Sequence, residues 1–124
     1  MATVLLLDDD PLALGVLTAC LKRAGHEVLA ASDGEQGLGM LARRGDSVDV
    51  VVTDLFMPEA DGIEVVRTAR ATRPEIPVLV VSGGSRRGGV NFLGMAASLG
   101  AARTLPKADA PRLLPAAIAE VLAV

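Results

Sequence analysis

The chain has 124 residues, 51% of them hydrophobic, and a formal net charge of −3 at pH 7. One domain over residues 1–124 is expected from this length, and the acidic balance argues against direct nucleic-acid binding. We also expect no membrane contact and a cytoplasmic location, because no run approaches the ~18 to 20 apolar residues that span a bilayer and no basic segment precedes the apolar residues 1–7.

The first predicted elements are a strand and a helix. ATVLLL at residues 2–7 is a short apolar run and predicts a buried strand. Asp10 before Pro11 is typical of an N-cap and a first helical position, and Gly25 predicts the end of this helix. A single cysteine cannot form an internal disulfide, and we assign Cys20 to the core because it shares a helical face with apolar neighbours. These neighbours are Ala13, Val16, Leu17, Leu21 and Ala24.

Two further strands flank a second predicted helix. HEVLA at 26–30 predicts an outer strand, and we expect His26 to be structural or exposed rather than a phosphoryl relay or metal ligand. Asp33 predicts the N-cap of the following helix. VDVVVT at 48–53 predicts a central strand buried on both faces. Asp54 follows at once, so its carboxylate should lie at the strand's edge, where another group can pair or solvate it.

The last elements continue the alternation of helices and strands. Asp61 predicts the start of a third helix, and PVLVVS at 77–82 predicts another central strand. GGSRRGG at 83–89 is rich in glycine and predicts a flexible loop. ARTLP at 102–106 predicts a second outer strand. In the final helix Pro115 has no N–H to donate, which predicts a bend or a delayed start.

This alternation predicts an α/β fold, a doubly wound parallel sheet of five strands with five helices on its two faces. Ligands of such sheets bind outside the carboxyl ends of the strands. The residues at these ends carry acidic, hydroxyl and ammonium groups, which we expect to meet at one edge. They are Asp8, Asp9, Asp54, Ser82 and Lys107.

Three carboxylates at one edge indicate a cation site. Like charges ~4 Å apart cost about 4 kcal/mol at an effective dielectric constant of ~20. Mg²⁺ would relieve this repulsion, since it prefers oxygen ligands and commonly binds one or two carboxylates with a phosphate oxygen. An aspartate can also attack phosphorus as a nucleophile, and Lys107 and Ser82 could then neutralise the phosphoryl oxygens.

The chain resembles a response-regulator receiver domain along its whole length. The resemblance rests on LLLDDDP, DLFMPEADG, LVVSGG and LPKA, which occur in the order typical of that family. It implies a flavodoxin-like sheet with strand order 2-1-3-4-5. It also implies a switch in two-component signalling that receives a phosphoryl group from a histidine kinase or phosphotransfer protein, as a monomer or weak dimer.

The resemblance also implies a role for each site residue. Asp54 is the phosphoryl acceptor, and Asp9 and Asp54 bind Mg²⁺ directly. Asp8 acts mainly through water, and the backbone carbonyl of Phe56 completes the protein ligands. Ser82 and Lys107 take the positions of the hydroxyl residue and the lysine that contact the phosphoryl group. Met57, Pro58 and Gly62 shape the loop that presents Asp54.

The sequence departs from the family's usual pattern at three places. Ala108 follows Lys107 where proline is usual, and since a cis bond before a non-proline costs ~2.5 to 4 kcal/mol we expect a trans bond. Ser82 is followed by Gly83 and Gly84 instead of bulkier residues. Thr104 stands where receivers usually have an aromatic ring, so we expect phosphorylation to move residues 83–89 and the helix start near Phe92 more than the fifth strand.

Two other functions remain open. A haloacid-dehalogenase-type phosphatase would also have an Asp-x-Asp sequence after its first strand, but Pro11 follows directly and no later acidic pair ends a strand. Turnover of a generic phosphomonoester would identify that enzyme, whereas a receiver catalyses only its own phosphorylation and dephosphorylation. A phosphate-independent binding module with the same fold is the other alternative. We expect no output domain after residue 124, so the chain is a stand-alone receiver or a part of a longer protein.

Overall fold

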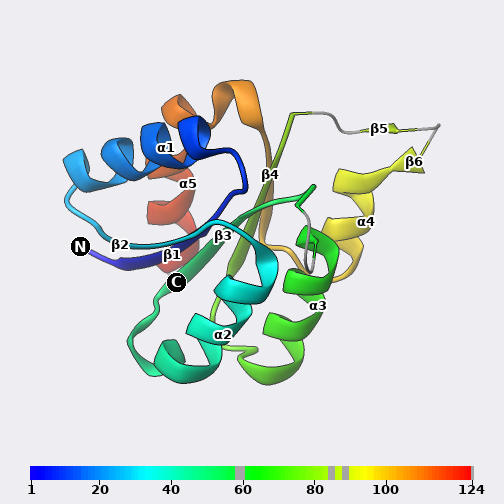
Figure 1. Ribbon diagram of the computed structural model, residues 1–124, viewed down its shortest axis with the longest axis horizontal. Helices are drawn as coiled ribbons and strands as arrows, with labels where there is room; N and C mark the ends of the chain where they lie inside the picture. Colours follow the sequence, from blue (N-terminus) through cyan, green and yellow to red (C-terminus); the bar gives the residue numbers. More distant parts are fainter. Residues whose placement is uncertain (58–60, 84–85, 88–89, 124) are drawn as a thin grey trace.

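A five-stranded parallel sheet lies at the centre of the structure, a computed structural model that describes residues 1–57, 61–83, 86–87 and 90–123. The strand order is β2-β1-β3-β4-β7, which confirms the predicted order 2-1-3-4-5 (Figure 1). Each predicted strand is present within one or two residues of its expected limits. The strands are β1 Thr3–Leu7, β2 Glu27–Ala31, β3 Val50–Asp54, β4 Val78–Ser82 and β7 Arg103–Pro106.

Five α-helices cover the two faces of this sheet in the described part of the chain (Figure 1). Helices α1 (Pro11–Arg23) and α5 (Ala110–Leu122) pack together on one face. Helices α2 (Gly34–Arg44), α3 (Gly62–Thr72) and α4 (Phe92–Ser98) lie side by side on the other. Short 3₁₀ turns, η1 (Gly45–Ser47) and η2 (Lys107–Asp109), precede β3 and α5. None of the described helices combines the length and apolar character needed to cross a membrane.

Alternate residues of the central strands build one core on each side of the sheet. Leu5, Leu7, Val51 and Val80 face helices α2 to α4, and we call their cluster the α2–α4 core. Val4, Leu6, Val52 and Val81 belong to the cluster under α1 and α5, the α1–α5 core. Burying one such side chain contributes about 1.5 to 3 kcal/mol. Since both faces are covered, these strands read as continuous apolar runs in the sequence.

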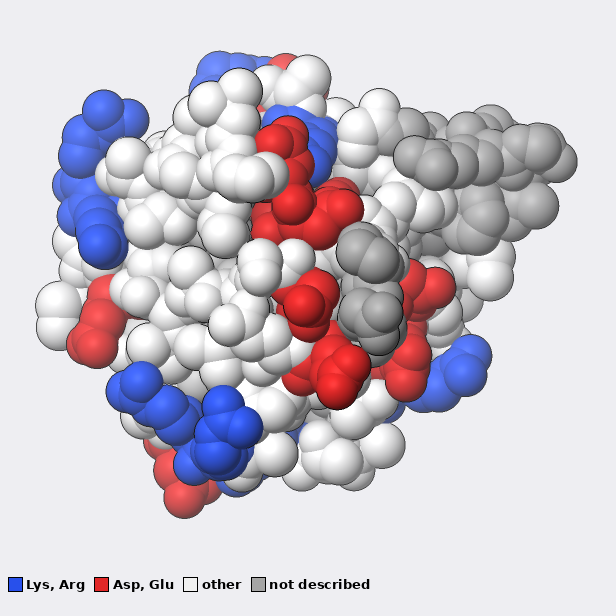
Figure 2. Space-filling view, in the orientation of Figure 1, with Lys and Arg blue, Asp and Glu red and all other residues white. Residues whose placement is uncertain are grey.

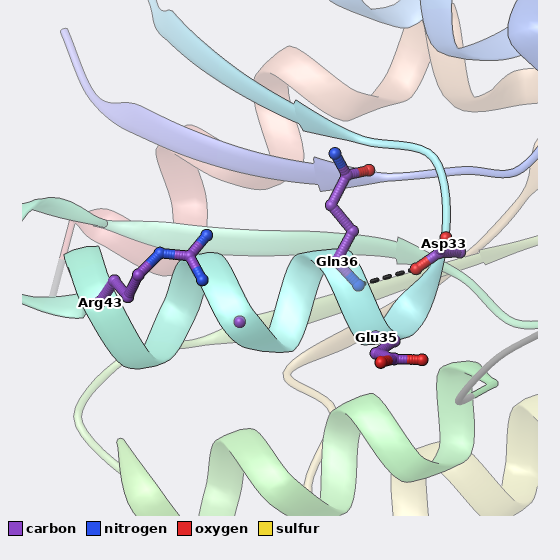
Figure 3. A pocket seen from close by; sticks show the side chains of 5 residues that line it. Asp33, Glu35, Gln36 and Arg43 are labelled. Atoms are coloured by element: carbon purple, nitrogen blue, oxygen red, sulfur yellow. Dashed lines mark hydrogen bonds between the residues drawn. The ribbon is translucent and has the colours of Figure 1, made fainter.

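The predicted helix caps are confirmed. The side chain of Asp10 accepts from the backbone N–H of Leu12, and Asp61 caps α3 in the same way. Asp33 accepts from the Gln36 N–H at 2.7 Å, at the start of α2, as Figure 3 shows. Gly25 has a φ of 93°, a conformation that glycine adopts without strain just beyond a helix end.

The prediction that Cys20 belongs to the core is wrong, because the residue is only partly buried. Leu17 and Leu21 are buried as expected, but Val16 is 46% exposed and Cys20 is only half-buried. Helix α1 turns Leu17 and Leu21 toward the sheet, which leaves Cys20 at the margin facing α5. There the Cys20 Sγ donates a hydrogen bond to the carbonyl oxygen of Pro111, 3.1 Å away.

The same contact bears on Pro115 in the last helix, whose start is not delayed. Helix α5 begins at Ala110 and continues through Pro115. Pro115 has no N–H for the carbonyl of Pro111, four residues earlier. The Cys20 thiol donates to that carbonyl in its place. The helix therefore keeps a donor for this group although a proline lies in its interior.

The segment after β4 contains secondary structure that the sequence did not predict. Arg86–Arg87 (β5) and Val90–Asn91 (β6) form an antiparallel pair within and beyond the expected loop. Residues 84–85 and 88–89 lie outside the described residues, as do the side chains of 86–87 and 90–93. The expected flexibility of residues 83–89 and their response to phosphorylation therefore stay predictions.

His26 has the structural role we expected, since its Nδ1 accepts from the Ala2 N–H at 3.1 Å.

Candidate functional site

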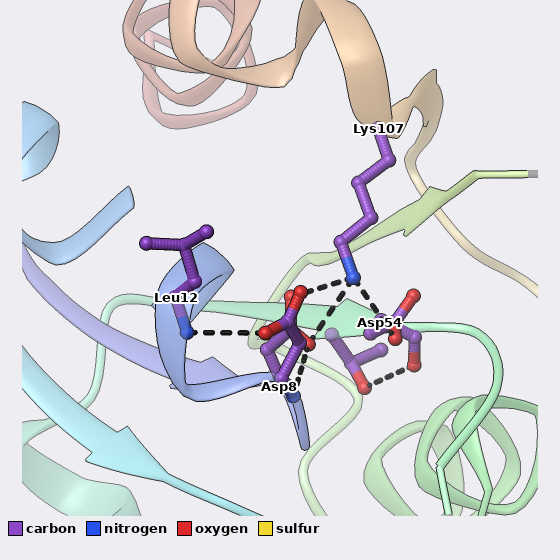
Figure 4. Close-up of polar contacts among 6 residues, drawn as sticks. Asp8, Leu12, Asp54 and Lys107 are labelled. Carbon is purple, nitrogen blue, oxygen red and sulfur yellow. Dashed lines mark hydrogen bonds and ion pairs between the residues drawn. The ribbon is translucent and has the colours of Figure 1, made fainter. Parts of the chain in front are cut away.

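Three of the predicted site residues, Asp8, Asp54 and Lys107, meet at the carboxyl edge of the sheet (Figure 4). Asp8 follows β1, Asp54 is the last residue of β3, and Ser82 is the last residue of β4. Lys107 opens η2, directly after β7. The parallel strands thus bring together residues that are up to 99 positions apart in sequence.

Three carboxylates form the acidic part of this edge. Asp8, Asp9 and Asp54 each offer an oxygen, and these oxygens all lie within 4.8 Å of one another. Asp8 and Asp54 are 2% and 7% exposed, whereas Asp9 is exposed. Figure 2 shows acidic side chains gathered along the middle of one face, while most basic side chains lie toward its margins. This arrangement combines buried negative charge with access from solvent.

Lys107 reaches into the acidic cluster and contacts two of its members. Its Nζ lies 3.1 Å from Asp8 Oδ2 and 3.4 Å from Asp54 Oδ2, as the dashed lines in Figure 4 indicate. The Asp8 carboxylate also accepts from the backbone N–H of Asp10, whose own side chain caps α1. Asp8 is therefore fixed by both the lysine and the start of α1, and the lysine bridges β1 and β3.

The surroundings of Asp54 disfavour the charged form of its carboxyl group. Burial raises the pKa of the Asp54 carboxyl group above its ordinary value, and the charge of Asp8 raises it further. Lys107 opposes these effects without overcoming them. Burial lowers the pKa of Lys107, but its hydrogen bond to Asp8 and the charge of Asp54 outweigh this, so the net shift is upward.

These two shifts describe the Lys107–Asp54 pair differently. The raised pKa of Lys107 indicates a favourable pair, whereas the raised pKa of Asp54 indicates an unfavourable one. The raised pKa of Asp54 follows first from its burial and then from the charge of Asp8, whereas that of Lys107 follows from the carboxylates that outweigh its burial. The site therefore carries excess negative charge, which a further cation would relieve.

The chain after Asp54 is held closely against the start of α3. Leu55 donates its N–H to the carbonyl of Val81, and its own carbonyl accepts from the Gly62 N–H at 2.8 Å. A Cβ on Gly62 would lie 2.5 Å from the Asp54 carbonyl oxygen and 2.6 Å from the Leu55 Cα. Only glycine fits this approach without a shift of backbone. Met57 is buried in the α2–α4 core, and Pro58 lies outside the described residues.

The remaining predicted residues occupy neighbouring positions. Ser82 is 2% exposed, and its Cα pairs with Pro106 across β4 and β7. Phe56 is half-buried and packs against the α2–α4 core. The bond between Lys107 and Ala108 is trans, as expected, since no cis peptide bond occurs among the described residues. Thr104 is a half-buried residue of β7.

Two features beside the site were not predicted from the sequence. The hydroxyl group of Thr53 donates to the carbonyl oxygen of Asp54 at 2.9 Å. A small pocket of about 220 Å³ also lies between α1 and Lys107, with Leu12, Val16 and Pro111 in its lining. Leu12 is 75% exposed, which the helical pattern around it did not indicate.

Residues 4–119 match the family model described as the response regulator receiver domain. The transcriptional regulatory protein CpxR of Klebsiella pneumoniae subsp. pneumoniae (strain HS11286) is 37% identical over 122 residues, which are 98% of this chain. The chain spans only half of the length of CpxR.

Solved receiver domains share the fold. The response regulator receiver domain protein of Clostridium thermocellum has a TM-score of 0.90 at 28% identity, covering 99% of this chain and 95% of that one. The BeF3-activated DrrB receiver domain has a TM-score of 0.84 at 25% identity, covering 100% and 99% of the two chains. With the family match over nearly its whole length, the chain belongs to the response regulator receiver domains of two-component systems.

Proposed function

We propose that this receiver works as a phosphorylation switch in which Asp54 accepts the phosphoryl group from a histidine kinase or phosphotransfer protein. One observation carries the proposal. Three carboxylates lie within 4.8 Å of one another, and a lysine ammonium contacts the two that are buried. Such excess negative charge next to a single cation suits a site that takes up a metal ion and a phosphoryl group together.

The residues at this edge fit Mg²⁺. Carboxylate oxygens are its preferred protein ligands, and a divalent cation would offset both the burial of Asp54 and the charge of Asp8, which together raise the pKa of Asp54. Asp9 and Asp54 would hold the ion directly, Asp8 mainly through water, and the carbonyl of Phe56 would complete the protein ligands. The bound ion would neutralise charge on the phosphoryl oxygens.

The side chains of the protein itself supply the nucleophile and further charge neutralisation. An Asp54 carboxylate oxygen forms a bond to phosphorus, and the bond between phosphorus and the donor nitrogen breaks. Its electron pair stays on the donor's imidazole, and the product is an acyl phosphate. Lys107, 3.4 Å from Asp54 Oδ2, pairs with the transferred phosphoryl oxygens. Ser82, at the end of the neighbouring strand, donates its hydroxyl to them.

The proposed donor protein contacts the pocket beside Lys107. Leu12 and Val16 are 75% and 46% exposed there, next to a lysine that already contacts Asp54. An apolar rim next to the lysine that contacts the acceptor suits a protein surface better than a small molecule. Val16→Glu should therefore slow phosphorylation by a phosphotransfer protein and leave phosphorylation by acetyl phosphate unchanged. Equal effects on both donors would overturn this docking role.

Phosphorylation by a small donor tests the acceptor assignment. Wild-type protein is incubated with acetyl phosphate, with and without Mg²⁺, and its intact mass is measured. The expected result is the addition of one phosphoryl group that requires Mg²⁺ and is lost in Asp54→Asn. Asp33→Asn is the matched control, since asparagine also caps helices well and Asp33 lies at the start of α2. An unmodified wild type, or a phosphorylated Asp54→Asn protein, would overturn the proposal.

A turnover assay with a generic phosphomonoester, together with the mass measurement, separates the two alternative functions. Catalytic turnover of a generic phosphomonoester would indicate a phosphatase of the haloacid-dehalogenase type. A folded protein that binds Mg²⁺ but never gains a phosphoryl group would indicate a phosphate-independent binding module. The close approach of Lys107 to both buried carboxylates favours the switch over that module.

A further inference from the structure

The residue before the acceptor places a hydroxyl group inside the apolar core. Thr53 is 0% exposed, and strand alternation puts its side chain on the same face of β3 as Val51, toward the α2–α4 core. Its Cα pairs with Leu7 on one side and with Val80 on the other. Valine would fill this position with a methyl group and would bring no polar atom into the core. The hydroxyl is thus not required by packing.

The hydroxyl group of Thr53 has a defined partner. Its Oγ1 lies 2.9 Å from the carbonyl oxygen of Asp54 and donates to it. That oxygen belongs to the peptide group that joins Asp54 to Leu55. The orientation of this peptide group fixes the backbone torsion that follows the Asp54 Cα, and it directs the chain toward Phe56.

The same peptide group is also confined by the start of α3. A Cβ on Gly62 would lie 2.5 Å from the Asp54 carbonyl oxygen, so the helix backbone approaches this atom closely. The next carbonyl, that of Leu55, accepts from the Gly62 N–H at 2.8 Å. The peptide after Asp54 is therefore held by a hydrogen bond from Thr53 and by close packing of Gly62.

We propose that Thr53 is a positioning residue for phosphoryl transfer, whose hydroxyl orients the peptide after Asp54 and thereby the acceptor carboxylate. This role rests on the proposed function of Asp54 as the acceptor. Thr53 touches neither the phosphoryl group nor the donor. It acts through the backbone of its neighbour, where a small rotation displaces the carboxylate from the line of attack.

Two substitutions separate the hydroxyl from the methyl group of Thr53. Thr53→Val keeps the volume and removes the donor, whereas Thr53→Ser keeps the donor and leaves a small void in the core. We expect the maximal rate of phosphorylation by acetyl phosphate at saturating Mg²⁺ to fall roughly tenfold in Thr53→Val. Thr53→Ser should melt at a lower temperature than wild type and still react near the wild-type rate. The rate would then follow the hydroxyl and not the stability.

A measurement without metal or phosphodonor examines the hydrogen bond itself. The amide ¹⁵N shift of Leu55 and the carbonyl ¹³C shift of Asp54 respond to donation at the Asp54 carbonyl. Both should change in metal-free Thr53→Val and stay near wild-type values in Thr53→Ser. If Thr53→Val does not fold, Thr53→Cys replaces it, because its thiol is a weaker donor, and it should react more slowly than Thr53→Ser.

The outcomes distinguish this role from the proposed function. A wild type that is never phosphorylated refutes the acceptor role of Asp54 and with it the role of Thr53. A wild type that is phosphorylated at Asp54, with equal rates in the valine and serine variants, refutes the role of Thr53 alone. The same holds for equal rates in the cysteine and serine variants.

Discussion

The close approach of α3 to the acceptor strand makes Gly62→Ala a sensitive perturbation. The new Cβ would lie 2.5 Å from the Asp54 carbonyl oxygen, whereas ordinary contacts begin at 3.4 Å. The two backbone segments must therefore separate by roughly 0.9 Å, the difference between these two distances. The nearest atoms belong to the backbone, so no change of side-chain rotamer relieves the contact.

The magnitude of the effect follows from this displacement. Overpacking of this kind costs about 1 to 3 kcal/mol, and the better helix propensity of alanine returns at most ~1 kcal/mol. We expect Gly62→Ala to lower the free energy of unfolding by about 1 to 2 kcal/mol. A shift near 1 Å beside the acceptor should also slow phosphorylation by as much as ~100-fold.

Urea unfolding and the initial rate of phosphorylation by acetyl phosphate measure the two effects. Gly15→Ala is the control, because a Cβ at this exposed position of α1 meets nothing within 4 Å. The control should be more stable than wild type by about 0.5 to 1 kcal/mol and should react at the wild-type rate. A Gly62→Ala protein with the stability and rate of wild type would refute the close approach at the acceptor.

Three further predictions concern charge and hydrogen bonding. Folding raises the pKa of Asp54. The protonated carboxyl group therefore stabilises the folded protein fully below its ordinary pKa, and this contribution is lost as the pH rises through the pKa in the folded state. Asp54→Asn should therefore raise the melting temperature of metal-free protein at neutral pH, and a gain that does not shrink on acidification or on addition of Mg²⁺ would contradict this origin. Lys107→Ala should fold, but without metal it should melt at a lower temperature, because Asp8 and Asp54 lose their cation. Addition of Mg²⁺ should restore its melting temperature, whereas its phosphorylation should stay slow. Cys20→Ala should lower the free energy of unfolding by about 1 kcal/mol. Cys20→Ser should not lower it, since serine can still donate to the Pro111 carbonyl. Equal urea midpoints for the two variants would show that this hydrogen bond contributes nothing.

Most of the fold could be predicted from local sequence patterns. Largely apolar stretches such as 48–53 and 77–82 indicated strands covered on both faces, and the structure buries every residue of β3 and β4. Asp33 and Asp61 indicated helix starts because an acidic side chain can accept from the free N–H groups of a first turn. The order of strand and helix then placed Asp8, Asp54 and Lys107 at one edge, since parallel strands end together.

The features that the sequence did not predict depend on contacts between distant segments. The burial of Cys20 depends on how α1 is rotated toward α5, which helical periodicity alone does not determine. Pro115 is accommodated within α5 because a thiol on another helix donates to the carbonyl it leaves unpaired. The strands β5 and β6 have two residues each, too short for any periodicity.

The site shows the same division between local pattern and tertiary contact. The motifs around Asp9, Asp54 and Lys107 indicated which groups belong together. The hydroxyl of Thr53 could not be distinguished from an ordinary strand residue, because threonine is common in strands. Its role depends on the direction of its Oγ1, which only the folded backbone determines.

Chemical trapping of the phosphorylated residue tests the central claim most directly. Borohydride reduces an aspartyl phosphate to homoserine, so the protein is treated with acetyl phosphate and Mg²⁺, reduced, digested and analysed by peptide mass spectrometry. If Asp54 is the acceptor, homoserine should be found at position 54 and in place of no other aspartate. Homoserine at Asp8 or Asp9, or a stable phosphate ester on Ser82, would contradict it.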